Sequence, residues 1–174
     1  MKAGWILAGL VLSGAAASAD DAPVLSVDGY ARLKIGMTPE KMESVLSQKV
    51  GYNQYANHGC SVFTTPAMEH LGLSFVIDNK KLVRINVDYY SANAEPRKTK
   101  TIAGVGLSSS EDEVLKVYGA DASVKPNPAD PQWHTIFVDT PDHASGIAFE
   151  TDGKTVKSMR AGTYPALSTA TGCP

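Results

Sequence analysis

Two stretches of the chain alternate apolar and polar residues in the manner typical of β-hairpins. In the first, residues 72–80 are followed by 82–87; in the second, residues 146–154 are followed by 155–160. Each predicts two strands joined by a tight polar turn, and Asp152-Gly153 is a strong hairpin signal. The first strands align at a spacing of 74 residues and the second strands at 73. We therefore expect Phe75 and Phe149 to be equivalent core residues.

A helix start precedes each predicted hairpin. Thr38 is a good N-cap because Pro39 follows it, and proline is favoured at the first helical position. Ser110 lies 72 positions further on and is followed by three acidic residues, which favour the positive end of a helix. Residues 61–64 and 134–139 supply one more strand each. The pattern predicts a unit made of one helix and about three antiparallel strands, and this unit occurs twice along the chain.

The predicted fold class is therefore α+β, with two tandem helix-plus-antiparallel-sheet repeats. We place the first repeat at residues 20–98 and the second at 99–174, with the polar segment 92–100 between them. A three-stranded sheet with one apolar face needs a helix on that face, which each unit provides. Since domains of this size bury little apolar surface, we expect the units to pack on each other and to be joined by a disulfide.

The residues that carry this pattern resemble known proteins. They are Ile35-Gly36-Met37-Thr38, Gly104-Val105-Gly106 through Tyr118-Gly119, Gly146 through Gly153, Ala161-Gly162 and Gly172-Cys173. The unit resembles the fold shared by the beta-lactamase inhibitor protein family and the BamE-like (SmpA/OmlA) outer-membrane lipoproteins, and the whole chain resembles a group of exported bacterial proteins. In the inhibitor family the unit is a tandem pair whose sheets form a concave binding surface. The resemblance implies a protein-binding module.

The N-terminus has the pattern of a secretory signal peptide at residues 1–19. Lys2 supplies the positive charge, residues 5–12 are apolar but too few to span a bilayer, and Ala17-Ser18-Ala19 is a small-residue cleavage site. We expect the mature protein to begin at Asp20 and to be periplasmic or secreted, with no membrane span.

The chain has two cysteines, Cys60 and Cys173. In an exported protein a pair of cysteines most simply forms a disulfide, which here would tie the middle of the chain to its last residue but one. A loop near 100 residues gives about 4–5 kcal/mol of stabilisation in the chain-entropy account. The alternative is a catalytic thiol with His58 as its base.

Composition, charge and the motifs missing from the sequence argue against several classes of function. Of 174 residues 43% are hydrophobic and 20% charged, and 16 basic residues stand against 18 acidic ones. The chain has no basic run, so we expect no nucleic-acid partner. It contains no zinc-ligand spacing, phosphate loop or nucleophile elbow, and we expect no metal, no cofactor and no enzymatic activity.

A partner-binding surface is expected on the sheet faces that point away from the helices. If Ile85 and Val156 point inward, strand alternation turns their neighbours outward. Aromatic and arginine side chains on such a face are typical of interfaces. The candidate binding residues are Trp133, Tyr90, Arg84, Lys157 and Met159. The predicted function is an inhibitor or immunity-type protein that binds an enzyme of the bacterial envelope. The alternative is a structural or assembly factor of the envelope.

Overall fold

The computed structural model describes residues 24–52, 59–88, 96–170 and 172–173. The predicted signal peptide and the candidate binding residue Tyr90 lie outside the described residues. Within the described part of the chain, no helix is long and apolar enough to cross a membrane.

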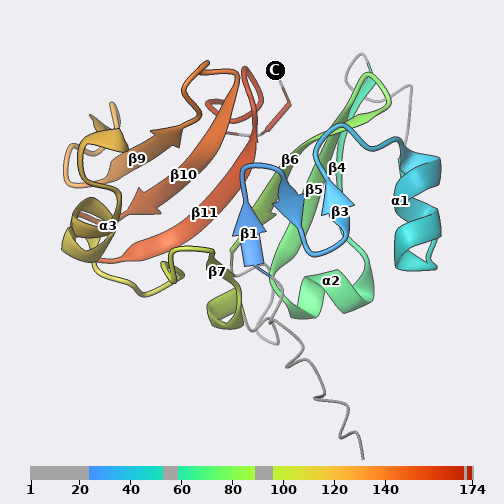
Figure 1. The fold of residues 1–174 in the computed structure, drawn as a ribbon, viewed down its shortest axis with the longest axis horizontal. Coiled ribbons are helices and arrows are strands. Elements are labelled where there is room, and N and C mark those ends of the chain that lie inside the picture. Colours follow the sequence, from blue (N-terminus) through green and yellow to red (C-terminus); the bar gives the residue numbers. More distant parts are fainter. Residues whose placement is uncertain (1–23, 53–58, 89–95, 171, 174) are drawn as a thin grey trace, which may run out of the picture.

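The first half of the chain forms a series of very short strands, two helices and three longer strands (Figure 1). Its elements are β1 (Val24–Ser26), β2 (Gly29–Tyr30), β3 (Leu33–Lys34), α1 (Pro39–Leu46), β4 (Cys60–Phe63), α2 (Pro66–His70), β5 (Leu73–Asp78) and β6 (Lys81–Val87).

The second half again places a helix before its longer strands. Its elements are the 3-10 helix η2 (Pro96–Lys98), β7 (Lys100–Thr101), α3 (Glu111–Tyr118), the 3-10 helix η3 (Gly119–Asp121), β8 (Ala122–Pro126), β9 (His134–Asp139), β10 (Ser145–Thr151) and β11 (Val156–Thr163). The predicted α+β class is confirmed. The sequence did not predict β1–β3, α2 or β8, because such short segments carry too few residues for a periodicity.

Seven of the strands form one antiparallel sheet in the order β4-β5-β6-β11-β10-β9-β8. The two halves of the chain meet where β6 pairs with β11, with Val87 opposite Met159 and Arg84 opposite Gly162. The second sheet has the order β3-β2-β1-β7 and lies over one face of the larger sheet (Figure 1).

Each long hairpin contains a β-bulge beside its turn. Ile77 pairs with Leu82 whereas Val76 pairs with Arg84, so Val83 is an extra residue on β6. On β11 the extra residue is Lys157, because Thr151 pairs with Val156 whereas Glu150 pairs with Ser158. A bulge reverses which face the following residues occupy relative to a simple alternation.

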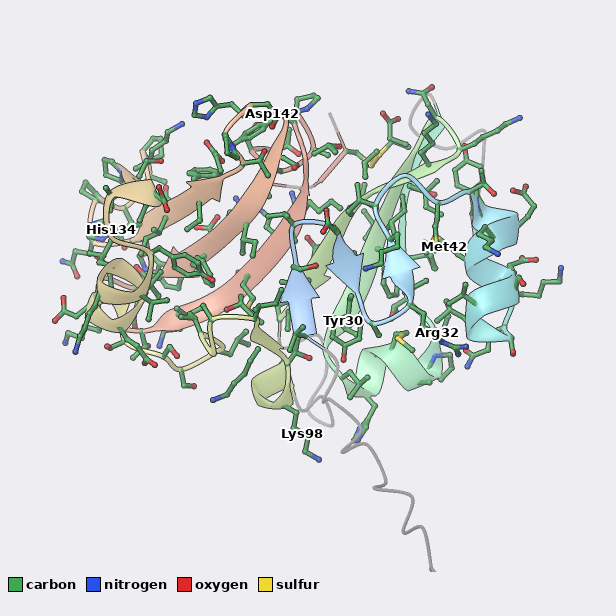
Figure 2. All side chains as sticks on the ribbon, viewed as in Figure 1. Tyr30, Arg32, Met42, Lys98, His134 and Asp142 are labelled. Carbon is green, nitrogen blue, oxygen red and sulfur yellow. A yellow bond between two sulfur atoms is a disulfide. The ribbon has the colours of Figure 1, made fainter. Side chains whose placement is uncertain are left out.

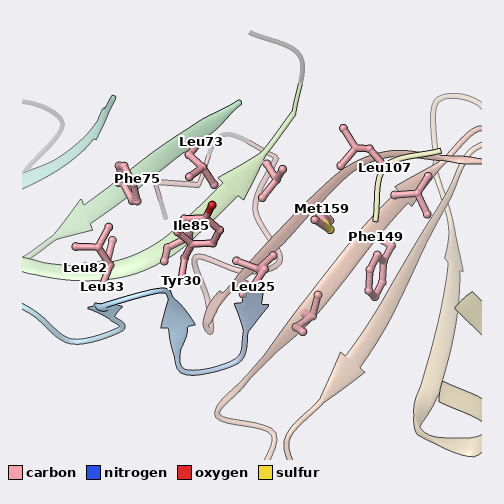
Figure 3. Packing of buried hydrophobic residues seen from close by; sticks show 14 of the residues in the cluster. Leu25, Tyr30, Leu33, Leu73, Phe75, Leu82, Ile85, Leu107, Phe149 and Met159 are labelled. Atoms are coloured by element: carbon pink, nitrogen blue, oxygen red, sulfur yellow. The ribbon is translucent and has the colours of Figure 1, made fainter. Parts of the chain in front are cut away.

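One face of the seven-stranded sheet forms the hydrophobic core. Phe75 and Phe149 are fully buried there, as predicted. Met42 of α1 and Val114 of α3 reach the same core, and Met42 lies between its helix and the sheet (Figure 2). From the smaller sheet, Tyr30 points toward Ile85 of β6 (Figure 3). The core is therefore covered by α1, by α3 and by the smaller sheet.

The two main helices begin in the same way. Thr38 Oγ1 accepts a hydrogen bond from the Lys41 amide at 3.4 Å, and Ser110 Oγ accepts one from the Glu113 amide at 3.0 Å. Both predicted N-caps are thereby confirmed, since capping side chains satisfy amides that the helix leaves unpaired.

Backbone hydrogen bonds also fasten each helix start to the hairpin that follows it. The Gly36 amide donates to the Leu82 carbonyl at 2.7 Å, and the Leu82 amide donates to the Met37 carbonyl at 2.8 Å. In the second half, the Ser108 amide donates to the Val156 carbonyl at 2.9 Å, and the Val156 amide donates to the Ser109 carbonyl at 2.9 Å. The positions of Gly36 and Ser108 match even in φ, which is +88° and +71°.

Candidate partner-binding face

The face of the seven-stranded sheet opposite the core carries a group of polar side chains, and we call it the polar face. Strand register places its side chains in rows that cross the junction between β6 and β11. It is defined by Ser74, Arg84, Asn86, Thr135, Glu150, Ser158 and Arg160. Side chains from both halves of the chain thus share one surface.

Residues 164–170 and 172–173 run over part of this face, and we call them the strap. Arg84 holds it from β6. Arg84 Nη1 donates to the carbonyl oxygens of Ala166 at 2.8 Å and Thr169 at 2.5 Å, and Nη2 lies 3.5 Å from the Ala170 carbonyl. Its Nε donates to Asn86 Oδ1. Arg84 therefore points away from the core, as predicted, but it is only 5% exposed because the strap covers it.

Arg160 holds the strap from the neighbouring strand. Its Nε donates to the Leu167 carbonyl at 2.7 Å, and its Nη1 donates to Glu150 Oε1 at 2.6 Å. Glu150 Oε2 also accepts from the Thr135 hydroxyl at 2.9 Å. The Arg160–Glu150 pair thus links the strap to β10 and β9.

The apolar contacts of the strap are few. Leu167 is fully buried and forms a small cluster with Phe137 and Ala148, against which Tyr164 packs. Gly172 lies so close to Val76 that a Cβ built there would sit 2.7 Å from Val76 Cγ2. This second cluster is separate from the main core.

The end of the strap is covalently joined to β4. Cys60 and Cys173 form a disulfide with Cα atoms 5.7 Å apart and 113 residues between them in the sequence. The predicted pairing is confirmed, and the thiol alternative is wrong because a disulfide sulfur is no free nucleophile.

A polar pocket of about 300 Å³ opens on the polar face beside the strap. It lies at the junction of the two halves, and its wall combines hydroxyl, amide, carboxylate and guanidinium groups. Its lining includes Asn86, Asp88, Asn127, Glu150, Ser158 and Arg160. Such a wall can both donate and accept hydrogen bonds.

Trp133 lies at the end of the loop that joins β8 to β9. The loop is ordered by its own hydrogen bonds: the Asn127 amide donates to the Trp133 carbonyl at 2.7 Å, and the Trp133 amide donates to the Asp130 carbonyl at 2.9 Å. Trp133 is 37% exposed. Its loop neighbour Asn127 lines the polar pocket, so the loop that bears Trp133 borders the polar face.

The bulge at Lys157 places one of the candidate binding residues differently from the prediction. The shift turns Met159 inward, where it is fully buried opposite Phe149, so the prediction that Met159 faces outward is wrong. Lys157 is exposed as expected, but its Nζ pairs with Asp152 Oδ2 at 2.8 Å. That interaction holds the Asp152 pKa well below its usual range.

Two ionisable groups connect elements around the sheet. Tyr164 of the strap donates its hydroxyl to Asp139 Oδ1 at 2.8 Å. Burial, followed by the Asp139 carboxylate, raises the pKa of Tyr164 to about 12. His134 Nδ1 lies 2.8 Å from Glu111 Oε1, which ties β9 to the start of α3 (Figure 2). The described residues contain no cluster of three or more histidine, cysteine, aspartate or glutamate side chains able to hold a metal.

Comparison with protein-family models, curated proteins and solved structures finds no match to this chain.

Proposed function

We propose that this protein is an exported, non-enzymatic protein-binding module that acts on an enzyme of the bacterial envelope as an inhibitor or immunity-type protein. The observation that carries the proposal is the pairing of β6 with β11, which joins both halves into one sheet with a continuous polar face. That face has a pocket of about 300 Å³, and the loop that borders the pocket at Asn127 also carries the partly exposed Trp133. Aromatic anchors beside polar groups are typical of binding surfaces.

Export is proposed on two grounds. The first is the signal-peptide pattern of residues 1–19. The second is the Cys60–Cys173 disulfide, because such bonds persist in oxidising compartments such as the periplasm.

We also propose that the chain is a tandem repeat of one unit, related to the folds of the beta-lactamase inhibitor protein and BamE. Matching features support this: both hairpins have a bulge beside the turn, and both helix starts bond to the second strand of the hairpin that follows. Leu82 and Val156 are the bonded residues, at a spacing of 74. This spacing equals that of Phe75 and Phe149, so the second strands align best at 74 rather than 73.

The test is affinity capture from envelope extract with the mature oxidised protein. Ser158→Arg places a long charged side chain at the polar pocket, and Ile102→Arg is a matched control on a turn where Ile102 is 77% exposed. We expect an enzyme to be retained by the wild type and by Ile102→Arg but lost by Ser158→Arg. Adding the protein to that purified enzyme should lower its activity.

The outcomes separate the candidate functions. Retention by both variants would place the binding surface elsewhere on the molecule. A retained partner that belongs to an outer-membrane complex and has no activity to inhibit would favour an assembly factor.

A further inference from the structure

Most of the hydrogen bonds between the sheet and the strap are donated by two arginines to the strap's backbone. Arg84 and Arg160 lie on adjacent strands, and together they donate to the carbonyl oxygens of Ala166, Leu167 and Thr169 at 2.5–2.8 Å. A guanidinium offers several donors in a fixed plane, which suits it to several carbonyls at once. The polar face therefore binds the strap mainly through the strap's backbone carbonyls. Leu167 is the one large side chain of the strap that is fully buried.

The strap contributes nothing to the main hydrophobic core. None of the buried residues of that core belongs to residues 164–173, and Leu167 packs in the separate cluster with Phe137 and Ala148. Lifting the strap would therefore expose two arginines and a few apolar groups on the polar face and leave the core face of the sheet covered.

The strap is fastened at both ends. At one end it continues from β11, and at the other Cys173 is bonded to Cys60 on β4, the edge strand of the sheet. The disulfide therefore closes the strap into a loop between β11 and β4.

We infer that the strap is a removable cover over the part of the polar face beside the pocket, and that reduction of the Cys60–Cys173 disulfide opens it and enlarges the binding surface. This regulation rests on the proposed function of the polar face. In the closed form the strap occupies the guanidinium donors of Arg84 and Arg160. In the open form the groups that donated to the strap, Arg84 Nη1 and Arg160 Nε, face a partner beside the polar pocket. They fit a partner loop that presents its own backbone carbonyls as the strap does.

The chemistry requires a dithiol reductant. Cys60 is 2% exposed, whereas Cys173 is partly exposed, so a thiolate of the reductant attacks Cys173 Sγ. A mixed disulfide with Cys173 forms and Cys60 Sγ leaves as a thiolate, which takes up a proton. The second thiol of the reductant then displaces Cys173 as a thiol, and the reductant is oxidised to its disulfide.

Hydrogen exchange of the intact mature protein tests the inference. The strap reporters are the amides of Leu167 and Ser168, which donate to the carbonyls of Thr163 at 2.8 Å and Pro165 at 3.0 Å. The core reporters are the amides of the β6–β11 ladder. Three samples are compared: the oxidised protein, the protein reduced with a dithiol, and the Cys60→Ser/Cys173→Ser double variant without reductant.

We expect the strap amides in the reduced protein and in the double variant to lose nearly all of their protection. Ladder amides should remain protected and exchange faster only by the factor that the lower free energy of unfolding gives. Strap amides that keep their protection after reduction would overturn the inference, because the arginines alone would then hold the cover. Equal loss at strap and ladder would also overturn it, because the bond would then hold the whole fold. The measurement involves no partner, so failure to find one would count against the proposed function only.

Discussion

Asn86 and Arg160 lie directly opposite each other where β6 pairs with β11, on the polar face of the sheet. They stand 74 positions apart in the sequence, as do Phe75 and Phe149. An antiparallel pair in which corresponding residues face each other is the arrangement that a two-fold axis through the sheet would create. The pairing therefore supports the proposal that the molecule is built from two copies of one unit.

Asn86 connects two other buried polar side chains of the polar face. Asn86 accepts from Arg84 Nε through its Oδ1 and donates from Nδ2 to Ser74 Oγ at 2.9 Å. Replacing Asn86 by alanine removes a partner from each of these buried groups, so we expect the free energy of unfolding to fall by about 1–3 kcal/mol. Urea denaturation measures it. Gln48→Ala, at an exposed position, should change stability by less than about 0.5 kcal/mol.

Replacing either of the two core phenylalanines by alanine should lower the free energy of unfolding by a similar amount. Phe149 packs against Tyr118 of α3 with ring centroids 5.6 Å apart, and Phe75 packs against Phe63 at 5.3 Å. Replacing either phenylalanine by alanine should lower the free energy of unfolding by about 3–5 kcal/mol, through lost burial and the cavity left behind. Ile102→Ala is the control, since Ile102 is 77% exposed. A loss below about 1 kcal/mol at either phenylalanine would contradict the assigned register.

Much of the fold could be predicted because its signals are local. The alternation around Phe75 and Phe149 gives the hairpins, and the capping side chains of Thr38 and Ser110 mark the helix starts. The disulfide was predictable from the number of cysteines together with the signal-peptide pattern of residues 1–19. Very short strands such as β2, which has two residues, show no alternation of apolar and polar positions in the sequence.

The candidate site was harder to predict because it depends on non-local structure. The bulge at Lys157 inserts one residue without a marker in the sequence, and it reversed the expected side of Met159. Strand alternation placed Arg84 on the correct face. The cover over Arg84 comes from residues 82 to 86 positions away, and no periodicity reports a contact of that kind.

The disulfide should also raise global stability. The Cys60→Ser/Cys173→Ser double variant should lose about 2–5 kcal/mol in the free energy of unfolding, because the unfolded chain is no longer closed into a long loop. Urea titration of the variant and the oxidised wild type measures the difference. Two free thiols in the denatured, non-reduced wild type would contradict the prediction at its root.

Stability should fall at alkaline pH partly through Tyr164. Its pKa is raised from about 10 to about 12 in the folded state, first by burial and then by the hydrogen bond to the Asp139 carboxylate. The folded state thus binds this proton more tightly than the unfolded state does. The resulting stabilisation is full below pH 10 and is lost as pH rises from about 10 to 12.

The variant Tyr164→Phe isolates this contribution. It should be less stable than the wild type at pH 8, because the hydroxyl no longer bonds to Asp139, and its stability should decline less between pH 10 and 12. Equilibrium unfolding at a series of pH values measures both effects. Parallel curves for the two proteins across that range would contradict the assignment.

Trp133 should contribute more to binding than to folding. Three prolines precede it within eight residues, and its loop is ordered by internal hydrogen bonds, so the indole loses little freedom when a partner binds. Because Trp133 is 37% exposed, replacement by alanine should change the melting temperature little. Affinity for the captured partner should fall by about 2 kcal/mol or more, close to thirtyfold. Stability and affinity must be measured on one preparation of Trp133→Ala. If the variant melts far below the wild type and its folded fraction binds normally, the indole belongs to the packing of the second half, and the binding energy of the polar face comes from other residues.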